Sequence, residues 1–496
     1  MDTLVFGNSM SNFSSETEDN IFLSKQQQFI VDDNQRNYSR NEITWSSVTL
    51  SNNGSFCDYQ NAFLSIPVVC RLTTSDALTA DEAKARIRLK NNLALLDSIS
   101  VQYNNTNVVQ ESAEMVGKLV FDQTTTLSKD DLTRSDVYGY VKDNSKWSYS
   151  ADYGVVNSTS VSDQRSEVPY QDVNTDIVSE ANMQSSGVDY HVMEDANNHY
   201  FFITCRIMLR DLDFFKKMPS LVKGANIRIT ARLNTGSMKV AVSAGGVKTV
   251  TNNVNGSCFP VMRIGPLLAN DSDEEIEMKI ASIGNYKHSQ QEARLYVNVY
   301  QLAPSFETQY LAIGSKKILY TDMYVNHLRK VGTGNSSHLI TNGLSRATRM
   351  IIMPLVSRDI AGVKMSQLDS PYCSSPCVVA PHNCFFNLKL SGRNLYTSPK
   401  QLKYETFLEE LHGKYGVGAG LEKGQSSSLI SMKDYNNTFG FVCFDLKHRH
   451  LEDYHTPVSY ELMVSNMGAK ELELLVYIEY EKDCIIDIST GQLLSA

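Results

Sequence analysis

The sequence predicts an all-β protein made of two β-sandwiches in tandem. The chain has 496 residues, and because sandwiches often run to roughly 200–250 residues as one domain, two of them fit this length. Apolar and polar residues alternate in many short runs, which is the pattern of half-buried strands. Gly and Asn clusters interrupt these runs, as turns between strands require. Each half combines many such runs with one prominent helical pattern, so we expect each half to be a sandwich.

A polar arm is expected to precede the first sandwich. Residues 1–40 are rich in Ser, Asn and Gln and weakly patterned, so we expect them to be ordered only by neighbouring molecules. Strand patterns begin at residues 43–50. The dense apolar run 63–72 is typical of a strand buried on both faces, and residues 93–110 indicate two strands joined at Asn104-Asn105.

Residues 201–234 predict a strand, a short helix and a second strand. Residues 201–209 alternate in hydrophobicity, and then the period changes. Leu212, Phe215 and Met218 recur every three residues and form the apolar stripe of a helix, which a proline ends. Alternation returns over residues 227–233.

The sequence between these elements is less regular. Residues 118–132 fit either a strand or a helix. Residues 133–195 are long and polar, and such a loop is usually functional or an excursion from the core. Residues 243–255 are rich in Gly and Asn, and the acidic run 270–277 is expected to be solvated.

A short helix-like link at 303–315 follows a cleanly alternating strand at 293–302. A second strand series then begins, with one good helix at 402–411. Its strands are expected at 317–325, 337–342, 349–356, 385–390, 440–446, 458–464 and 471–488. The expected division is therefore an arm at 1–40, a first sandwich at 41–302, a linker at 303–315 and a second sandwich at 316–496.

Charge and cysteine content narrow the functional classes. The net charge of −9 argues against wrapping nucleic acid, because affinity there depends on neutralising phosphates. The nine cysteines follow no disulfide framework, and we recognise neither a signal peptide nor an apolar run of the roughly 20 residues that span a bilayer. We therefore expect free, mostly buried thiols and folding in a reducing compartment.

Residues 201–234, FFITCRIMLRDLDFFKKMPSLVKGANIRITARLN, resemble the first jelly roll of the double-jelly-roll major capsid proteins of Polinton-like viruses and virophages. The likeness spans roughly residues 50–491 in the same order, and residues 133–200 and 235–275 show little of it. Tyr103 to Gln110 (YNNTNVVQ) resembles the family's hairpin, with Asn105 where Gly is commoner. The remaining similar segments are 294–317, 318–322, 340–354, 370–372, 391–394, 404–408, 429–431 and 477–491.

The resemblance implies an all-β fold of two tandem jelly-roll β-barrels, with short helices in the F–G-type loops. It implies a major capsid protein whose homotrimers form pseudo-hexagonal capsomers and tile the icosahedral shell of a small dsDNA virus or related element. The partners would be further copies of the chain, a vertex (penton) protein and other minor capsid proteins, with a possible internal membrane. We expect no enzymatic activity, no cofactor or metal, and no direct binding of nucleic acid. The chain would reside in the virion after assembly inside the host cell.

The strongest alternative is a metal-dependent bicupin or, more loosely, a carbohydrate-binding β-sandwich. His448 and His450 form an HxH motif, with Glu452, Asp453 and His455 close by. Two imidazoles on one face of a strand can share a metal. The cupin pattern, however, places its Glu three to four residues beyond the second His, and the second cupin motif is not recognisable. We interpret the cluster as a polar loop.

Other candidate sites are weaker. Cys373, Cys377, Cys384 and His382 have no zinc-finger spacing, and prolines interrupt them. The glycines of residues 416–424 (GVGAGLEKG) lack the order and context of a phosphate loop.

Two side-chain pairs also favour structural interpretations. Glu409 and Glu410 are neighbours on a helix and do not converge on one substrate. Phe214 and Phe215 are interpreted as core, plugging one end of the first barrel, and the adjacent Lys216-Lys217 as a solvated face.

Overall fold

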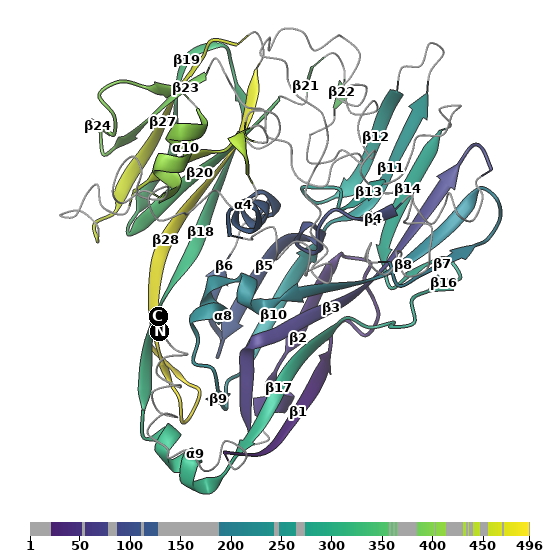
Figure 1. Ribbon diagram of the computed structural model, residues 1–496, viewed down its shortest axis with the longest axis vertical. Coiled ribbons are helices and arrows are strands. Elements are labelled where there is room, and N and C mark those ends of the chain that lie inside the picture. Colours follow the sequence, from purple (N-terminus) through teal and green to yellow (C-terminus); the bar gives the residue numbers. More distant parts are fainter. Residues whose placement is uncertain are drawn as a thin grey trace.

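The computed structural model shows a double jelly roll, in which two β-sandwiches each consist of two antiparallel sheets (Figure 1). The all-β expectation is confirmed. The structure describes residues 21–495 except for 52–54, 78–86, 111–113, 127–187, 243–247, 264–272, 357–358, 361–362, 365–383, 402, 413–429, 433–434, 436–439, 447–454 and 469–470.

The larger sheet of the first half, sheet 1A, has the strand order β1-β17-β3-β14-β11-β12, and β7, β8 and β9 join it through β3 and β8. β3 is mostly buried, as expected for the apolar run 63–72. The strands of sheet 1A are β1 (Phe22–Val31), β3 (Phe56–Thr74), β7 (Tyr190–Met193), β8 (Asn198–Met208), β9 (Val222–Lys223), β11 (Thr235–Val242), β12 (Lys248–Asn255), β14 (Glu274–Ile280) and β17 (Arg294–Leu302).

The second sheet of the first half, sheet 1B, has the order β2-β10-β5-β6. Its strands are β2 (Glu42–Ser46), β5 (Leu96–Tyr103), β6 (Thr106–Gln110) and β10 (Ile227–Leu233). The predicted hairpin at 93–110 is confirmed. Its turn residues Asn104 and Asn105 have φ of 46° and 69°, the left-handed region that a tight two-residue hairpin turn uses and that Asn tolerates.

Short elements complete the first half. Two small strand pairs are β4 (Ile87–Leu89) with β13 (Val261–Arg263), and β15 (Ser282–Ile283) with β16 (Tyr286–Lys287). The helical elements are α2 (Val48–Ser51), η2 (Asn92–Leu95), α4 (Val116–Thr126), η6 (Leu209–Asp211), α8 (Asp213–Lys217) and the connecting helix α9 (Pro304–Leu311).

The second half also has two main sheets. Sheet 2A has the order β18-β28-β20-β26 with β29 on β28, and sheet 2B the order β19-β27-β23-β24 with β25 on β23. Sheet 2A contains β18 (Ser315–Val331), β20 (Ala347–Val356), β26 (Val442–Asp445), β28 (Leu472–Asp487) and β29 (Leu493–Ser495). Sheet 2B contains β19 (Gly334–Leu344), β23 (Cys384–Leu390), β24 (Arg393–Asn394), β25 (Lys400–Gln401) and β27 (Val458–Asn466). The remaining elements are the pair β21 (Asp359–Ile360) and β22 (Val363–Lys364), and helix α10 (Tyr404–His412).

The expected arm at 1–40 is wrong for residues 22–31. These residues form β1, which pairs with β17 almost along its full length, and residues 1–20 lie outside the described part of the chain. The run KQQQ within β1 hides the strand from a hydrophobicity pattern, because an edge strand can carry polar side chains on both faces.

Other stretches differ from expectation for similar reasons. Val48 and Leu50 belong to helix α2 rather than to a strand. The Gly/Asn-rich stretch and the acidic stretch contain β12 and β14, where pairing with neighbouring strands outweighs low β-propensity. Glu274, expected to be solvated, is buried. The polar stretch 133–195 ends in β7, the ambiguous stretch 118–132 contains helix α4, and the turn expected at 52–54 lies outside the described residues.

Candidate functional site

The two halves meet along a buried interface that we call the seam. From the first half it contains α4, α8, the β5–β6 turn and residues 223–226. From the second half it contains β18, β20, β28 and residues 488–491. Figure 1 shows α4 and α8 lying between the two halves, next to β18 and β28. One hydrophobic core continues through the seam, and the members that come from the second half include Ile318, Tyr320, Met323, Ile351, Met353, Leu355, Phe407, Phe441, Leu475 and Tyr477.

Sheet 2A is buried on both faces because of this contact. Leu475 and Tyr477 of β28 belong to the core shared with the first half, whereas Leu474, Val476 and Ile478 belong to the separate core of the second sandwich. Successive side chains of a strand point to opposite faces, so one strand serves both cores. This explains the unbroken apolar run LLVYI at residues 474–478 of β28.

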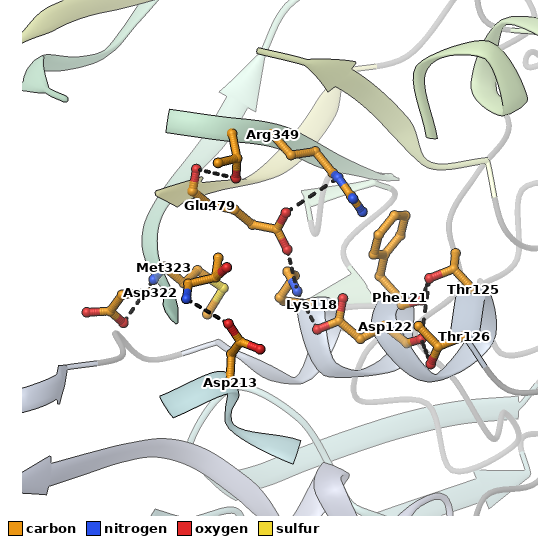
Figure 2. A network of polar contacts seen from close by, with 12 residues as sticks. Lys118, Phe121, Asp122, Thr125, Thr126, Asp213, Asp322, Met323, Arg349 and Glu479 are labelled. Carbon is orange, nitrogen blue, oxygen red and sulfur yellow. Dashed lines mark hydrogen bonds and ion pairs between the residues drawn. The ribbon is translucent and has the colours of Figure 1, made fainter. Parts of the chain in front are cut away.

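Four charged side chains join α4 to sheet 2A. Lys118 of α4 bonds to Asp122 on the same helix, and its Nζ lies 2.8 Å from Oε1 of Glu479 on β28. The other carboxylate oxygen of Glu479 lies 3.4 Å from Nε of Arg349, its cross-strand neighbour on β20. Figure 2 shows Glu479 between the two cations. The network therefore connects one element of the first half to two strands of the second.

The surroundings hold Lys118 and Glu479 in their charged forms, whereas burial raises the pKa of Asp122. The side chains of Lys118 and Glu479 are only 10% and 12% exposed. Burial by itself would lower the pKa of Lys118, but the charges of Asp122 and Glu479 outweigh it and raise that pKa. Burial would likewise raise the pKa of Glu479, but Lys118 and Arg349 lower it. A buried ion pair that is broken on one side leaves an uncompensated charge, so this contact favours one docking of α4 over others.

Helix α4 approaches sheet 2A very closely at Gly117. A Cβ atom at this position would lie 2.5 Å from the hydroxyl oxygen of Tyr477 and 2.7 Å from Cε of Met353. The Tyr477 hydroxyl donates a 2.7 Å hydrogen bond to the backbone carbonyl of Glu114, just before the helix. On the same helix, Phe121 packs edge-on against Phe407 and Phe441. Apolar packing and polar contacts thus both hold α4 against the second half.

Helix α8 forms a second contact across the seam. The Asp213 carboxylate accepts a 2.8 Å hydrogen bond from the backbone N–H of Thr321 on β18. Phe214 packs edge-on against Tyr103 of its own half and Tyr320 of the other, and the Tyr320 hydroxyl donates to the carbonyl of Val108. The predicted core role of Phe214 is confirmed, but it packs on the second half as well as within the first barrel.

A third contact joins the β5–β6 turn to the end of the chain. The Asn104 side chain donates a 2.7 Å bond to the Gly491 carbonyl and accepts one from the N–H of Asn226. Gly224 and Gly491 both have positive φ, 74° and 66°. A Cβ on Gly491 would lie 2.3 Å from the carbonyl oxygen of Lys223, so the two backbones touch. This explains why glycine suits both positions.

The sequence segments that carry the capsid-protein resemblance converge on the seam. The contacts above come from three of these segments: Asn104 lies in 103–110, helix α8 and Lys223-Gly224 in 201–234, and Gly491 in 477–491. Sequence analysis missed Glu114, Lys118 and Arg349. A signal for partners on β28 was present, because Glu473 and Glu479 flank the apolar run 474–478 and lie on one face of the strand.

The candidate metal and phosphate sites fall largely outside the described residues. This holds for His448, His450, Glu452 and Asp453, for Cys373, Cys377 and His382, and for the glycines of residues 416–424. His455 is described and exposed. In the described part of the chain, no group of three or more His, Cys, Asp or Glu side chains is placed to hold a metal ion.

The carboxylate pair on α10 is split between two environments. Glu410 is buried and accepts hydrogen bonds from the Tyr396 hydroxyl and the Asp445 backbone N–H. Glu409 lies 3.8 Å from the Nζ of Lys400. The same Nζ also lies 3.8 Å from Oε1 of Glu410, so the two carboxylates share one cation, whereas the Tyr396 and Asp445 hydrogen bonds belong to Glu410. Lys216 and Lys217 are exposed, as expected of a solvated face.

The described cysteines are all free and buried. Burial raises the pKa of the thiols of Cys384, Cys443 and Cys484 to about 12. These thiols are therefore protonated at neutral pH and poorly nucleophilic. Among the described residues, no helix is both long and apolar enough to cross a lipid bilayer.

Several solved structures that are similar to this chain come from viruses. The chain matches a chain in the cryo-EM structure of the Sputnik virophage with a TM-score of 0.55 and 10% identity, over 98% of this chain and 91% of that one. The mavirus major capsid protein gives a TM-score of 0.48 at 12% identity, over 98% and 92% of the two chains. The Faustovirus major capsid protein gives 0.48 at 11%, over 95% and 92%. No protein-family model and no curated protein sequence matches the chain.

Proposed function

We propose that this chain is a major capsid protein of a small dsDNA virus or related element. The observation that carries the proposal is the double jelly roll shared with the Sputnik virophage chain over 98% of the sequence. The seam supports it independently. A shell subunit must present two barrels at a fixed angle, and one continuous core with a buried ion network resists changes in that angle.

The proposed unit of assembly is a homotrimer. Three chains contribute six barrels, and six similar barrels in a ring approximate hexagonal symmetry, so one protein can tile a hexagonal lattice. Closed trimers also protect sheet edges that would otherwise invite uncontrolled pairing. In the described part of the chain such edges include β1 in sheet 1A and β18 in sheet 2A.

The proposed role is structural, with no chemistry of its own. Closure of an icosahedral shell requires a different protein at the five-fold vertices, so a penton protein and other minor capsid proteins are the expected partners. The net charge of −9 favours indirect contact with the genome, through an internal membrane or a basic protein. The expected location is the virion shell. We also propose a division into an arm, two sandwiches and a linker, in which β1 belongs to the first sandwich.

The absolute mass of the purified chain tests the trimer. Light scattering after size exclusion is expected to give three copies of the 55.6 kDa chain, about 167 kDa, stable to dilution. A stable monomer or dimer would contradict the proposed trimeric capsomer. Electron microscopy of concentrated trimers then tests whether they form sheets or shells.

A further inference from the structure

His327 of β18 lies between two carboxylates at the seam. Its Nδ1 is 2.9 Å from Oε1 of Glu114, which precedes α4 in the first half. Its Nε2 is 3.3 Å from Oε2 of Glu473, on β28 of the second half. The side chains of His327 and Glu473 are only 12% and 4% exposed.

Counting protons in this triad gives a charge state. A neutral imidazole has one N–H donor and one acceptor nitrogen, whereas an ionised carboxylate only accepts. Both ring nitrogens face carboxylate oxygens, so the two hydrogen bonds form together only if the triad holds one proton more than a neutral ring with two carboxylates. The geometry therefore requires an imidazolium, or its proton shared with a neighbouring carboxyl group.

We propose that the Glu114–His327–Glu473 triad is a proton-dependent tie between the two halves, and that loss of its extra proton at mildly alkaline pH loosens the docking of α4. The deprotonated ring would keep one hydrogen bond and turn a lone pair toward the other carboxylate. The Glu114 side of the triad leads directly into α4, whose Lys118 and Gly117 contacts lie one turn further on. The proposal concerns the seam of the single chain and does not depend on the shell role.

The charges around the triad come from four elements, β18, β20, β28 and α4. On β18 and next to β28, Lys330 and Glu471 form an exposed pair at 3.3 Å. On α4, Lys118 and Asp122 are paired with each other and with Glu479, which also binds Arg349 of β20. These cations already have carboxylate partners, and the two carboxylates that face the imidazole are Glu114 and Glu473.

The direction of the pH effect follows from the pKa of His327. Burial lowers this pKa, but the hydrogen bonds and charges of Glu114 and Glu473 outweigh burial and raise it to about 8. An exposed histidine titrates at about 6.5. Because the pKa is higher when the seam is closed, the stabilisation is complete below about pH 6.5 and is lost as the pH rises through 8.

Hydrogen–deuterium exchange of α4 tests the proposal on the full chain. The protection of the α4 amides, corrected for the intrinsic effect of pH on exchange, is expected to fall by about 30-fold between pH 6 and pH 9. Peptides from β19 and β27 of sheet 2B serve as an internal reference and should not change. Constant α4 protection over this range in the wild-type chain would overturn the proposal.

Two variants assign the effect to the triad. His327→Gln is expected to abolish the pH dependence of α4 protection. Glu473→Gln is expected to reduce it strongly, because the Gln amide can form a hydrogen bond with a neutral imidazole. His338→Gln is the matched control, since His338 lies on β19 and bonds to Ser336 of its own strand. If His327→Gln does not fold, the pH dependence of Glu473→Gln alone tests the role of the triad. A full wild-type pH dependence in Glu473→Gln would assign the titration to another group and overturn the proposal.

Discussion

At the scale of single residues, the seam is unusual in containing buried charge. The seam contains the charged side chains of Lys118, Glu479 and Arg349. Nearby positions of the seam, such as Leu475 and Tyr477, belong to the hydrophobic core. Burying charges costs free energy, and a well-packed apolar substitute is often at least as stable. The network therefore contributes more to the choice of one docking geometry than to overall stability, because any displaced arrangement would leave a charge unpaired.

Substitution of Lys118 tests this view. We expect Lys118→Met to lower the free energy of unfolding by about 1.5–3 kcal/mol, because Glu479 loses its charged partner across the seam and keeps only Arg349. Urea denaturation of the purified chain measures the loss. Lys217→Met is the matched control, because Lys217 is exposed on α8.

The double variant separates charge from packing. Lys118→Met combined with Glu479→Met is expected to cost less than the sum of the two single losses, because the contact between the two side chains is broken only once, although Arg349 then also loses Glu479. Equal losses for Lys118→Met and Lys217→Met would show that the network adds nothing to the stability of the seam.

At the scale of elements, the docking of α4 depends on a residue that weakens the helix itself. Glycine is less favourable than alanine in a helix, by up to about 1 kcal/mol in the interior, and Gly117 lies in the first turn of α4. Gly117 is nevertheless where α4 comes closest to Tyr477 and Met353. The tertiary contact thus outweighs the local preference of the backbone, and the helix is held mainly by packing on sheet 2A.

Gly117→Ala is therefore expected to destabilise the chain although it raises helix propensity. The added methyl group would overlap the buried Tyr477 hydroxyl, and such overpacking costs about 1–3 kcal/mol. The thermal unfolding midpoint measures the change. Gly332→Ala is the control, because a Cβ there meets no atom within 4 Å. A midpoint for Gly117→Ala at or above that of the wild-type chain would contradict the close approach.

At the scale of the whole molecule, the two sandwiches behave as one packed body. The shared core, the α4 network, the α8 contact and the contact between Gly224 and Gly491 all cross the seam. Sheet 2A is consequently an interior sheet with a partner on each face. In the proposed capsomer, a subunit built in this way would carry its two barrels at one fixed angle into the trimer and the lattice.

The proposed arm can be tested at this scale with a narrower deletion than the sequence suggested. Since β1 begins at Phe22, removal of residues 1–20 spares sheet 1A, whereas removal of 1–40 would delete its edge strand. We expect the chain lacking 1–20 to form trimers of unchanged stoichiometry but to assemble poorly into shells, as seen by light scattering and electron microscopy. Normal shells from this chain would argue against a role for the arm between capsomers.

Much of the fold was predictable because strands have a short and visible period. The hairpin at Asn104-Asn105, the strand–helix–strand unit around α8 and most strands of the second half follow from alternation and turn residues. The wrong predictions also have physical causes. The strand at residues 22–31 is a polar edge, and β12 and β14 owe their structure to neighbouring strands rather than to their own composition.

By itself, the sequence determined the all-β class, the division into two sandwiches with a helical link, and the resemblance to capsid proteins, because these depend on local periodicity and ordered motifs. Only the tertiary structure decided that distant motifs meet at one seam and that Glu114 and Glu473 both contact His327. These contacts join residues up to several hundred positions apart. No local pattern encodes such a distance, because it arises only when the two sandwiches pack against each other.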